Sequence, residues 1–294
     1  MSKSRPEKIP PVFDLEAFSK KATTANFYIQ TVADHLRDHP FINKPHRHDF
    51  YLILYISRGS GVHTIDFTDY DVGEKSVFLM TPGQVHSWRL DPDTDGYIVF
   101  FTRAFYRMQL RESNLLDFPF YHSPTATPAL TIEQDSSIDF VFEEMHREFT
   151  GSSLVNLRLL RNYLDILLLK LAKYFPDSEE VTLDSRTYRL RKLAQLIEAN
   201  YRKLRQPGQY ADLMNLSTSY LNALCKEALG KTLTQLIQER VILEARRLFS
   251  YSDANVNEVA TALNFNDVSY FIRFFRKHTG VTPEAFRKSV TRPI

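Results

Sequence analysis

The chain has 294 residues, with 37 Lys and Arg, 35 Asp and Glu, nine His and one Cys. This length is enough for two domains, and 43% hydrophobic with 24% charged residues is typical of a folded globular protein. A single cysteine excludes an internal disulfide framework, and no apolar run approaches the roughly 20 residues of a membrane span. We therefore expect a cytoplasmic protein with no membrane partner.

The charge is divided unequally along the chain. Residues 1–184 hold 19 basic and 26 acidic side chains, a net charge of −7, whereas residues 185–294 hold 18 and 9, a net charge of +9. A basic half of this kind predicts a polyanionic partner for the C-terminal part. A basic surface that is merely solvated is the alternative.

Residues 1–20 are predicted to be a flexible tail, and residues 21–132 a β domain. Turns at residues 58–61 and 70–73 and a polar break at 91–96 separate short segments rich in aromatic and β-branched residues. Strands of this length and spacing, with no long helical pattern between them, indicate a barrel or a sandwich. The predicted strands are residues 50–57, 62–67, 76–80, 86–90 and 97–102.

Residues 133–176 are predicted to be helical, followed by a polar linker at 177–185. The helix at 154–175 carries leucines on more than one face, and one domain surface buries only one apolar stripe. We therefore predict that this region mediates dimerisation, with a helix clamped between two domains as the alternative. The leucines are Leu157, Leu160, Leu164, Leu167, Leu168 and Leu171.

Residues 186–294 are predicted to be helical and to contain two helix-turn-helix units. The segments QYADLMNLSTSYLNALCKEALG and NVNEVATALNFNDVSYFIRFFRKHTG share one plan, a short helix, a turn with an apolar plug, and a second helix. Ser217 or Thr218 is expected to cap the second helix of the first unit, and Asp267 that of the second. A helix between the units can hold two reading helices in successive major grooves, roughly 34 Å apart.

The segment EARRLFSYSDANVNEVATALNFNDVSYFIRFFRKHTGVTPEAFRK, residues 244–288, resembles the signature of the AraC/XylS-type transcription regulators. The resemblance implies a seven-helix DNA-binding domain that inserts two helices into adjacent major-groove faces. It implies base-facing positions at Ser219, Asn222 and Ala223 and at Ser269, Ile272 and Arg273, with Lys226, Arg276 and Lys277 towards phosphates.

The chemistry of these side chains agrees with such roles. Arg273 can grip guanine with two donors, and Asn222 can pair with adenine. Ile272 departs from the family, in which a small polar residue is usual. The neighbouring apolar and aromatic residues are expected in the core, namely Tyr220, Leu224, Phe271, Phe274 and Phe275.

The segment PHRHDFYLILYISRGSG, with the later PGQVHSW, resembles the two motifs of the cupin barrel that often precedes such a DNA-binding domain. His46 and His48 occupy the His-x-His positions, and His86 occupies the later histidine position. The glutamate ligand of metal cupins is missing, so the resemblance favours effector contacts over a metal. The expected effector contacts are His46, His48, Tyr51, His86 and Trp88, and we predict no cofactor.

We therefore predict a multidomain protein with an all-β cupin-like barrel and an all-α double helix-turn-helix domain. It is expected to be a homodimeric, sequence-specific regulator that binds double-stranded DNA and responds to a small-molecule effector, and not an enzyme. Two alternatives stay open. One is a metal-dependent cupin enzyme with the metal at His46, His48 and His86, and the other is a DNA-binding regulator whose barrel binds no ligand.

Overall fold

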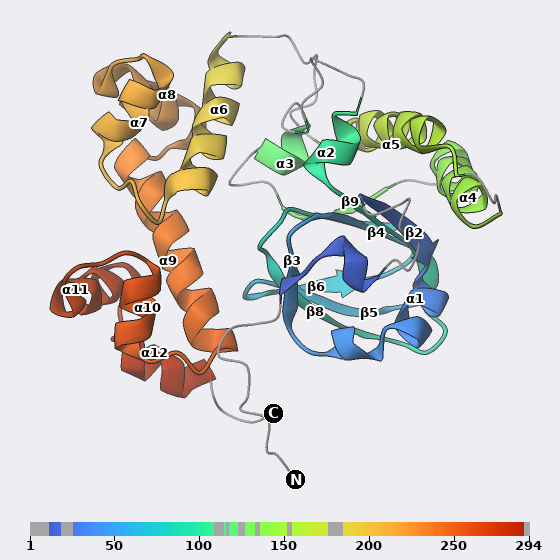
Figure 1. The fold of residues 1–294 in the computed structure, drawn as a ribbon, viewed down its shortest axis with the longest axis horizontal. Helices are drawn as coiled ribbons and strands as arrows, with labels where there is room; N and C mark the ends of the chain where they lie inside the picture. Colours follow the sequence, from blue (N-terminus) through green and yellow to red (C-terminus); the bar gives the residue numbers. More distant parts are fainter. Residues whose placement is uncertain are drawn as a thin grey trace. The chain divides into compact units, whose positions relative to one another are not determined.

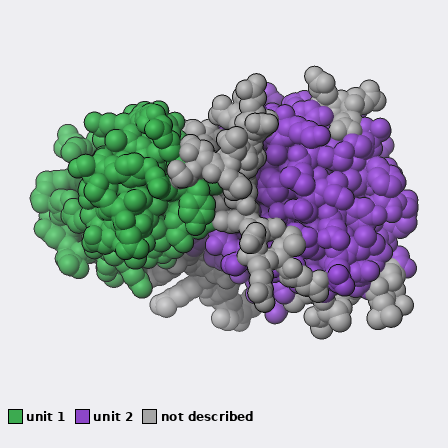
Figure 2. Space-filling view, turned by 90° about the horizontal axis from the view of Figure 1, so that it is seen from above, with its two compact units in different colours: residues 1–10, 182–294 green, residues 11–181 purple. Residues whose placement is uncertain are grey.

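The computed structural model describes residues 12–18, 26–108, 115, 118–122, 127–132, 136–151, 155–175 and 185–290. These divide into two compact units, one within residues 11–181 and the other within 182–294 (Figure 2). The first unit is rich in strands and the second is helical, which confirms the predicted fold class. Most of the predicted linker at 177–185 lies outside the described residues.

The N-terminal unit consists of two five-stranded sheets (Figure 1). One, called here the histidine sheet, has the order β1 (Val12–Phe13), β3 (His46–His48), β8 (Val85–Leu90), β5 (Gly61–Ile65), β6 (Thr68–Val72). The other, called the helix-covered sheet, has the order β10 (Ala129–Thr131), β7 (Ser76–Met80), β4 (Tyr51–Arg58), β9 (Asp95–Phe101), β2 (Phe27–Thr31).

The inner faces of the two sheets meet in an aromatic layer. The ring centroids of His48 and Phe100 lie 5.5 Å apart, and those of His63 and Phe78 lie 4.7 Å apart, each pair joining one sheet to the other. The short helices η1 (Leu15–Ala17), α1 (Val32–Asp38) and η3 (Pro40–Asn43) add the buried residues Leu15, Val32 and Ile42 to this core.

The predicted β domain differs from the structure in several local details. The predicted turn at 70–73 overlaps strand β6, an edge strand that alternates exposed polar and more buried residues and so has a turn-like composition. Strand β2 was not predicted. The predicted tail of residues 1–20 ends too late, because Val12 and Phe13 pair with Arg47 and His48. A two-residue parallel strand leaves no sequence signal of its own.

The turn predicted at residues 58–61 is present between β4 and β5. Gly59 has φ +94°, and a Cβ atom there would lie 2.4 Å from the Thr94 Cα. Only glycine satisfies both the backbone angle and the close approach.

Helix α4 (Ser136–Gly151) packs on the outer face of the helix-covered sheet (Figure 1). The Phe142 ring stacks on Tyr55 at 4.8 Å and on Tyr97 at 5.7 Å, and Lys75 Nζ lies 3.0 Å from the Asp139 carboxylate. The short helices α2 (Arg103–Tyr106) and α3 (Pro119–His122) join the same unit.

Helix α5 (Leu157–Ala172) packs against α4 and α2 and buries its leucines within the chain. Five of the six leucines on which the dimer prediction rested are fully covered, and Leu157 is half-buried. Because these leucines are already packed within this unit, they leave little exposed apolar surface for a partner chain. The large apolar side chains that α5 does expose are Ile166 and Leu169, at 42% and 55%.

The described C-terminal unit has seven helices, as the resemblance implies. Helix α9 (Leu233–Tyr251) has 19 residues and is about 28 Å long. Its two ends carry separate helix groups (Figure 1). At one end lie α6 (Ser185–Asn200), α7 (Pro207–Met214) and α8 (Thr218–Leu229), and at the other α10 (Val256–Ala262), α11 (Val268–Thr279) and α12 (Pro283–Val290).

The packing of α4 predicts a sharp contrast between two phenylalanines. Phe142→Ala removes a fully buried ring and should lower the free energy of unfolding of the N-terminal unit by about 3–5 kcal/mol. Phe140→Ala, on the same helix but 56% exposed, should change it by less than about 0.5 kcal/mol. Urea denaturation of both variants measures the difference, and equal effects would contradict the packing described.

Candidate DNA interface and barrel site

The two helix-turn-helix units repeat the same turn geometry. Asn215 and Asn264 have left-handed backbones, with φ of 53° and 57°, at the turns before α8 and α11. The next helix is then capped. Ser217 Oγ accepts from the Tyr220 N–H at 3.1 Å, and Asp267 Oδ1 accepts from the Ser269 and Tyr270 N–H groups at 2.7 and 3.1 Å. The expected caps are thus confirmed, with Ser217 rather than Thr218 in the first unit.

Close helix crossings and turn plugs hold each unit together. Ala211 and Ala260 are buried where α7 and α10 pack, and Phe265 is buried in the second turn, 4.9 Å from the Phe271 ring. Leu216, the plug of the first turn, is half-buried. The angle between the helices of each unit is therefore fixed by contacts predicted from the sequence.

A buried carboxylate ties α9 to its neighbours. Glu244 is buried and lies within ion-pair distance of Arg202, Arg240 and Arg247, at 3.0, 3.3 and 3.5 Å. Arg240 also pairs with Glu198 on α6 at 2.6 Å. These arginines fix the connecting helix, and Arg240 and Arg247 are too covered to meet DNA.

Helix α11 separates its core face from its solvent face. Phe271 and Phe275 are buried as predicted, whereas Phe274 is half-buried against Phe265 and His278. On the other side Ser269, Arg273, Arg276 and Lys277 are exposed, and Ile272 is half-buried. The exposed side is basic and offers the hydrogen-bond donors that phosphates and guanine accept.

Helix α8 has one of its predicted base-contacting residues, Asn222, already engaged within the unit. Ser219, Ala223 and Lys226 are exposed, but Asn222 is half-buried and its Oδ1 accepts from the Leu233 N–H at 3.0 Å, at the start of α9. A two-point contact with adenine requires that same oxygen. One lone pair of the Asn222 oxygen thus helps to cap α9, and the adenine contact, which would use the other lone pair and the amide N–H, stays a prediction.

Tyr220 and Leu224 were both expected in the core, but they differ in how far they are buried. Leu224 is buried, whereas Tyr220 is half-buried beneath the Arg189 guanidinium, whose carbon lies 5.2 Å from the ring centroid. The Arg189 guanidinium also donates a hydrogen bond to the Tyr220 hydroxyl. Tyr220 therefore joins α8 to α6 at the edge of the core.

In the N-terminal unit, the predicted histidines converge on the inner face of the histidine sheet. His46 on β3 is directly opposite His86 on β8, and His48 follows two residues after His46. All three side chains are buried. His48 Nε2 lies 2.9 Å from His86 Nε2, and His46 Nδ1 lies 2.8 Å from the Lys44 carbonyl oxygen.

A fourth histidine completes the group and was not predicted. His63 on β5 is fully buried, and its Nε2 lies 3.0 Å from His86 Nδ1. It faces Trp88 across the β5–β8 pairing. Its position in the alternating segment Gly61–Ile65 was visible in the sequence, but only the pairing of β5 with β8 brings it to the other histidines.

Burial keeps these imidazoles neutral. It lowers the pKa of His46 to about 4, against the opposing effect of the hydrogen bond to the Lys44 carbonyl, and lowers the pKa of His63 to about 3. The pKa values of His48 and His86 fall well below their usual range for the same reason, with neighbouring histidines adding to the effect. Neutral imidazoles can accept hydrogen bonds or bind metal ions.

Tyr51, an expected effector contact, faces away from the histidines. Its ring stacks on Phe101 at 5.4 Å and meets Tyr121 at 5.0 Å, and its hydroxyl accepts from Arg103 at 3.3 Å. Phe50 shares the inner face with His48, so the next residue points outward. The prediction for Tyr51 is wrong because it took the other phase of this alternation.

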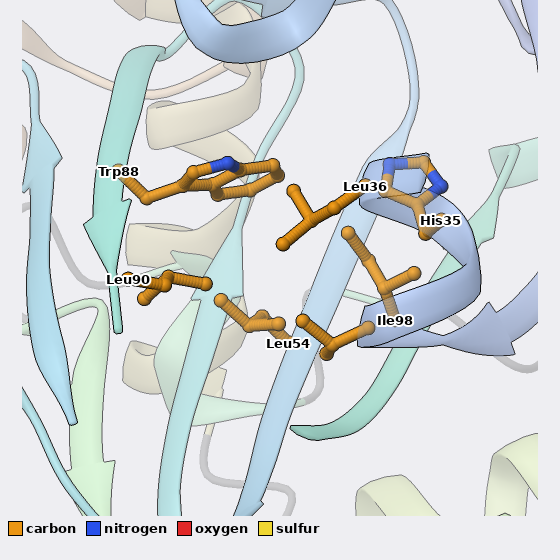
Figure 3. A pocket seen from close by; sticks show the side chains of 7 residues that line it. His35, Leu36, Leu54, Trp88, Leu90 and Ile98 are labelled. Carbon is orange, nitrogen blue, oxygen red and sulfur yellow. The ribbon is translucent and has the colours of Figure 1, made fainter. Parts of the chain in front are cut away.

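Trp88 lies on the inner face beside a small apolar hollow (Figure 3). The empty volume of the hollow is about 170 Å³, but it leaves no space for a water molecule. Pockets for organic ligands usually measure roughly 300–1,000 Å³. A bound effector would therefore have to move side chains apart. The lining residues are Val32, His35, Leu36, Leu54, Trp88, Leu90 and Ile98.

Comparison with known proteins accounts for both units. Residues 26–165 match the family model of an AraC-like ligand binding domain, and residues 210–289 match that of a helix-turn-helix domain. The chain belongs to the AraC-type transcription regulators. It is thus a DNA-binding transcription regulator with a domain for a small-molecule effector.

Several known proteins align with most of the chain. The arabinose operon regulatory protein of Salmonella typhimurium is 23% identical over 84% of this chain and 86% of its own length. The transcriptional activator RhaS of Klebsiella pneumoniae is 24% identical over 83% and 87%. The structure of ToxT from Vibrio cholerae covers 91% of this chain and 100% of its own, at 13% identity and a TM-score of 0.43. None of the described helices has the length and apolarity needed to cross a membrane.

The buried histidines predict a pH dependence of stability. Their folded pKa values lie below the ordinary value of 6.5, so the folded chain binds fewer protons than the unfolded chain below that pH. The free energy of unfolding should therefore stay level above pH 7. Between pH 6.5 and 5.5 it should fall by about 1 kcal/mol for each such histidine.

Urea denaturation with a chelator in the buffer measures this dependence. His63→Gln removes one of the histidines, so its free energy of unfolding should depend less steeply on pH than that of the native chain. If the free energy of unfolding depended on pH equally steeply in the two proteins, His63 would not stay neutral in the folded chain.

Proposed function

We propose that this regulator reads DNA with α8 and α11 in successive major grooves, and that its effector binds between the two sheets. The observation that carries the DNA part is the pair of capped, outward-facing helices at the two ends of α9. A 19-residue helix spans about 28 Å, close to the roughly 34 Å between successive turns of the groove.

Within this proposal, α11 supplies most of the sequence discrimination. Arg273 is exposed on its central turn and grips guanine, Ser269 bonds to a base or phosphate, and Ile272 contacts a thymine methyl or a sugar. Arg276 and Lys277 bind phosphates. On α8, Ser219 and Ala223 face the bases and Lys226 a phosphate, while Asn222 serves mainly to hold α9.

The effector is proposed to contact His46, His48, His86 and Trp88 at the inner face of the histidine sheet. Their neutral ring nitrogens offer both donors and acceptors to a small polar ligand. Because the hollow there has no room for even a water molecule, ligand entry would shift the chain towards a population in which the sheets are further apart. Such a regulator would work in the cytoplasm, where its DNA is found.

Arg273→Ala tests the reading role of α11. The variant should lose about 1–3 kcal/mol of binding free energy on the cognate site and discriminate less at one base pair. Lys277→Ala is the matched control, because loss of a phosphate contact should weaken cognate and random DNA equally and lower the salt dependence. Gel-shift titrations measure the affinity of both variants. If Arg273→Ala lost the same affinity for cognate and random DNA, Arg273 would not contact a base.

We also propose that the chain forms a homodimer through the exposed face of α5, with Ile166 and Leu169 at its centre. Leu169→Asp would bury a charge in that interface and should weaken dimerisation at least tenfold. Thr68→Asp, which places the same charge on the edge strand β6, should leave it unchanged. Sedimentation velocity over a concentration series decides, and a Leu169→Asp dimer as stable as the native one would place the interface elsewhere.

A further inference from the structure

Three buried histidines of the barrel have ring nitrogens close enough together to hold a metal ion. We propose that the N-terminal unit binds one divalent transition-metal ion through the Nε2 atoms of His46, His48 and His86. This deepens the proposed effector site and rests on the same three histidines, with the open coordination position of the ion left for the effector. Metal binding is measured without DNA or effector, so its failure is distinguishable from failure of the proposed function.

The geometry of the three imidazoles already approximates a metal site. One nitrogen from each lies within 4.8 Å of the others, and the ring centroids are 4.4 to 5.0 Å apart. A metal about 2.0–2.1 Å from each nitrogen places the nitrogens about 3.4 Å apart. The 2.9 Å contact between His48 Nε2 and His86 Nε2 therefore needs to open by about half an ångström, and nitrogens as far as 4.8 Å apart need to approach by about 1.4 Å.

Hydrogen bonds determine which nitrogen of His46 is free. A carbonyl oxygen only accepts, so the contact with Lys44 requires the His46 proton on Nδ1. The lone pair of His46 is then on Nε2, a buried atom with no hydrogen-bond partner among the described residues. An unpaired buried acceptor is costly, and a bound metal ion would satisfy it.

His63 can fix the tautomer of His86, as the Lys44 carbonyl fixes that of His46. When His86 binds metal through Nε2, its Nδ1–H can donate to His63 Nε2, 3.0 Å away. A partner of this kind fixes the tautomer and orientation of a ligating histidine. His63 is therefore a positioning residue rather than a ligand, and the Lys44 carbonyl does the same for His46.

The donor set also indicates the class of metal. Three neutral imidazoles suit Zn²⁺, Co²⁺, Ni²⁺, Cu²⁺ or Fe²⁺, whereas Mg²⁺ and Ca²⁺ prefer oxygen. Burial keeps the imidazoles unprotonated at neutral pH, as metal binding requires. Three protein ligands leave a position open for water or a ligand oxygen. The missing glutamate therefore leaves a three-nitrogen site rather than no site.

The chain contains its own probe of this site. Trp88 is the single tryptophan, and its ring centroid lies 5.1 Å from that of His86 and 6.2 Å from that of His46. A paramagnetic ion such as Co²⁺ held by these histidines quenches tryptophan fluorescence, whereas an ion on the distant surface does not.

The test uses the full chain, freed of metal with a chelator and titrated with Co²⁺ alone. We expect one ion per chain by equilibrium dialysis, quenching of Trp88, and the visible absorption bands of nitrogen-bound Co²⁺. His48→Gln and His86→Gln should abolish all three signals. His63→Gln should keep the stoichiometry but weaken binding about 10–100-fold, as expected for a positioning residue.

The matched control is His146→Gln, because His146 lies on α4 and bonds to Gln30 at 2.7 Å, away from the histidine sheet. It should bind Co²⁺ like the native chain. Circular dichroism checks that each variant is folded, and His46→Gln replaces any that is not. The proposal would be overturned if the native chain did not bind Co²⁺ or if bound Co²⁺ did not quench Trp88 fluorescence. It would also be overturned if the His48→Gln and His86→Gln variants bound Co²⁺ as tightly as the native chain.

Discussion

The antiparallel pairing of β3 with β8 is the constraint on which the N-terminal unit depends. It sets His46 opposite His86 and, through the alternation of side chains, directs His48 and Trp88 to the same inner face. A slip of one residue would send every one of them to the other face. The aromatic layer against the second sheet fixes this register, since His48 stacks on Phe50 and lies beside Phe100.

That constraint makes the core of the barrel polar where cores are usually apolar. Neutral histidines inside a protein lose hydration and keep only partial hydrogen bonding, as the unpartnered nitrogens of His46, His48 and His63 show. Such groups reduce the stability of the unit and make that stability depend on pH. The small hollow beside Trp88 is part of the same interior, so the proposed effector would act on the packing between the sheets.

The C-terminal unit depends on a different interaction. Glu244, buried among three arginines, fixes α9 to the helices at one of its ends, and α9 in turn spaces the two reading helices. Because a buried carboxylate without its cations is strongly destabilising, this cluster holds α9 in one orientation. Arg240 and Arg247 of α9 are thereby used to hold the unit together, whereas the arginines proposed to contact DNA, Arg273 and Arg276, are exposed on α11.

The sequence by itself determined the elements and motifs with local causes. The caps before α8 and α11, the small residues Ala211 and Ala260 and the buried Phe265 of the second turn follow from spacing along a helix. The resemblance to the AraC-type signature lies in the segment of residues 244–288. Tertiary structure decided what depends on pairing between distant segments. It brought His63 to His86, turned Tyr51 outward, buried the leucines of α5 and engaged Asn222 with α9. The physical reason is that strand register and helix packing join residues whose separation in the chain carries no periodic signal.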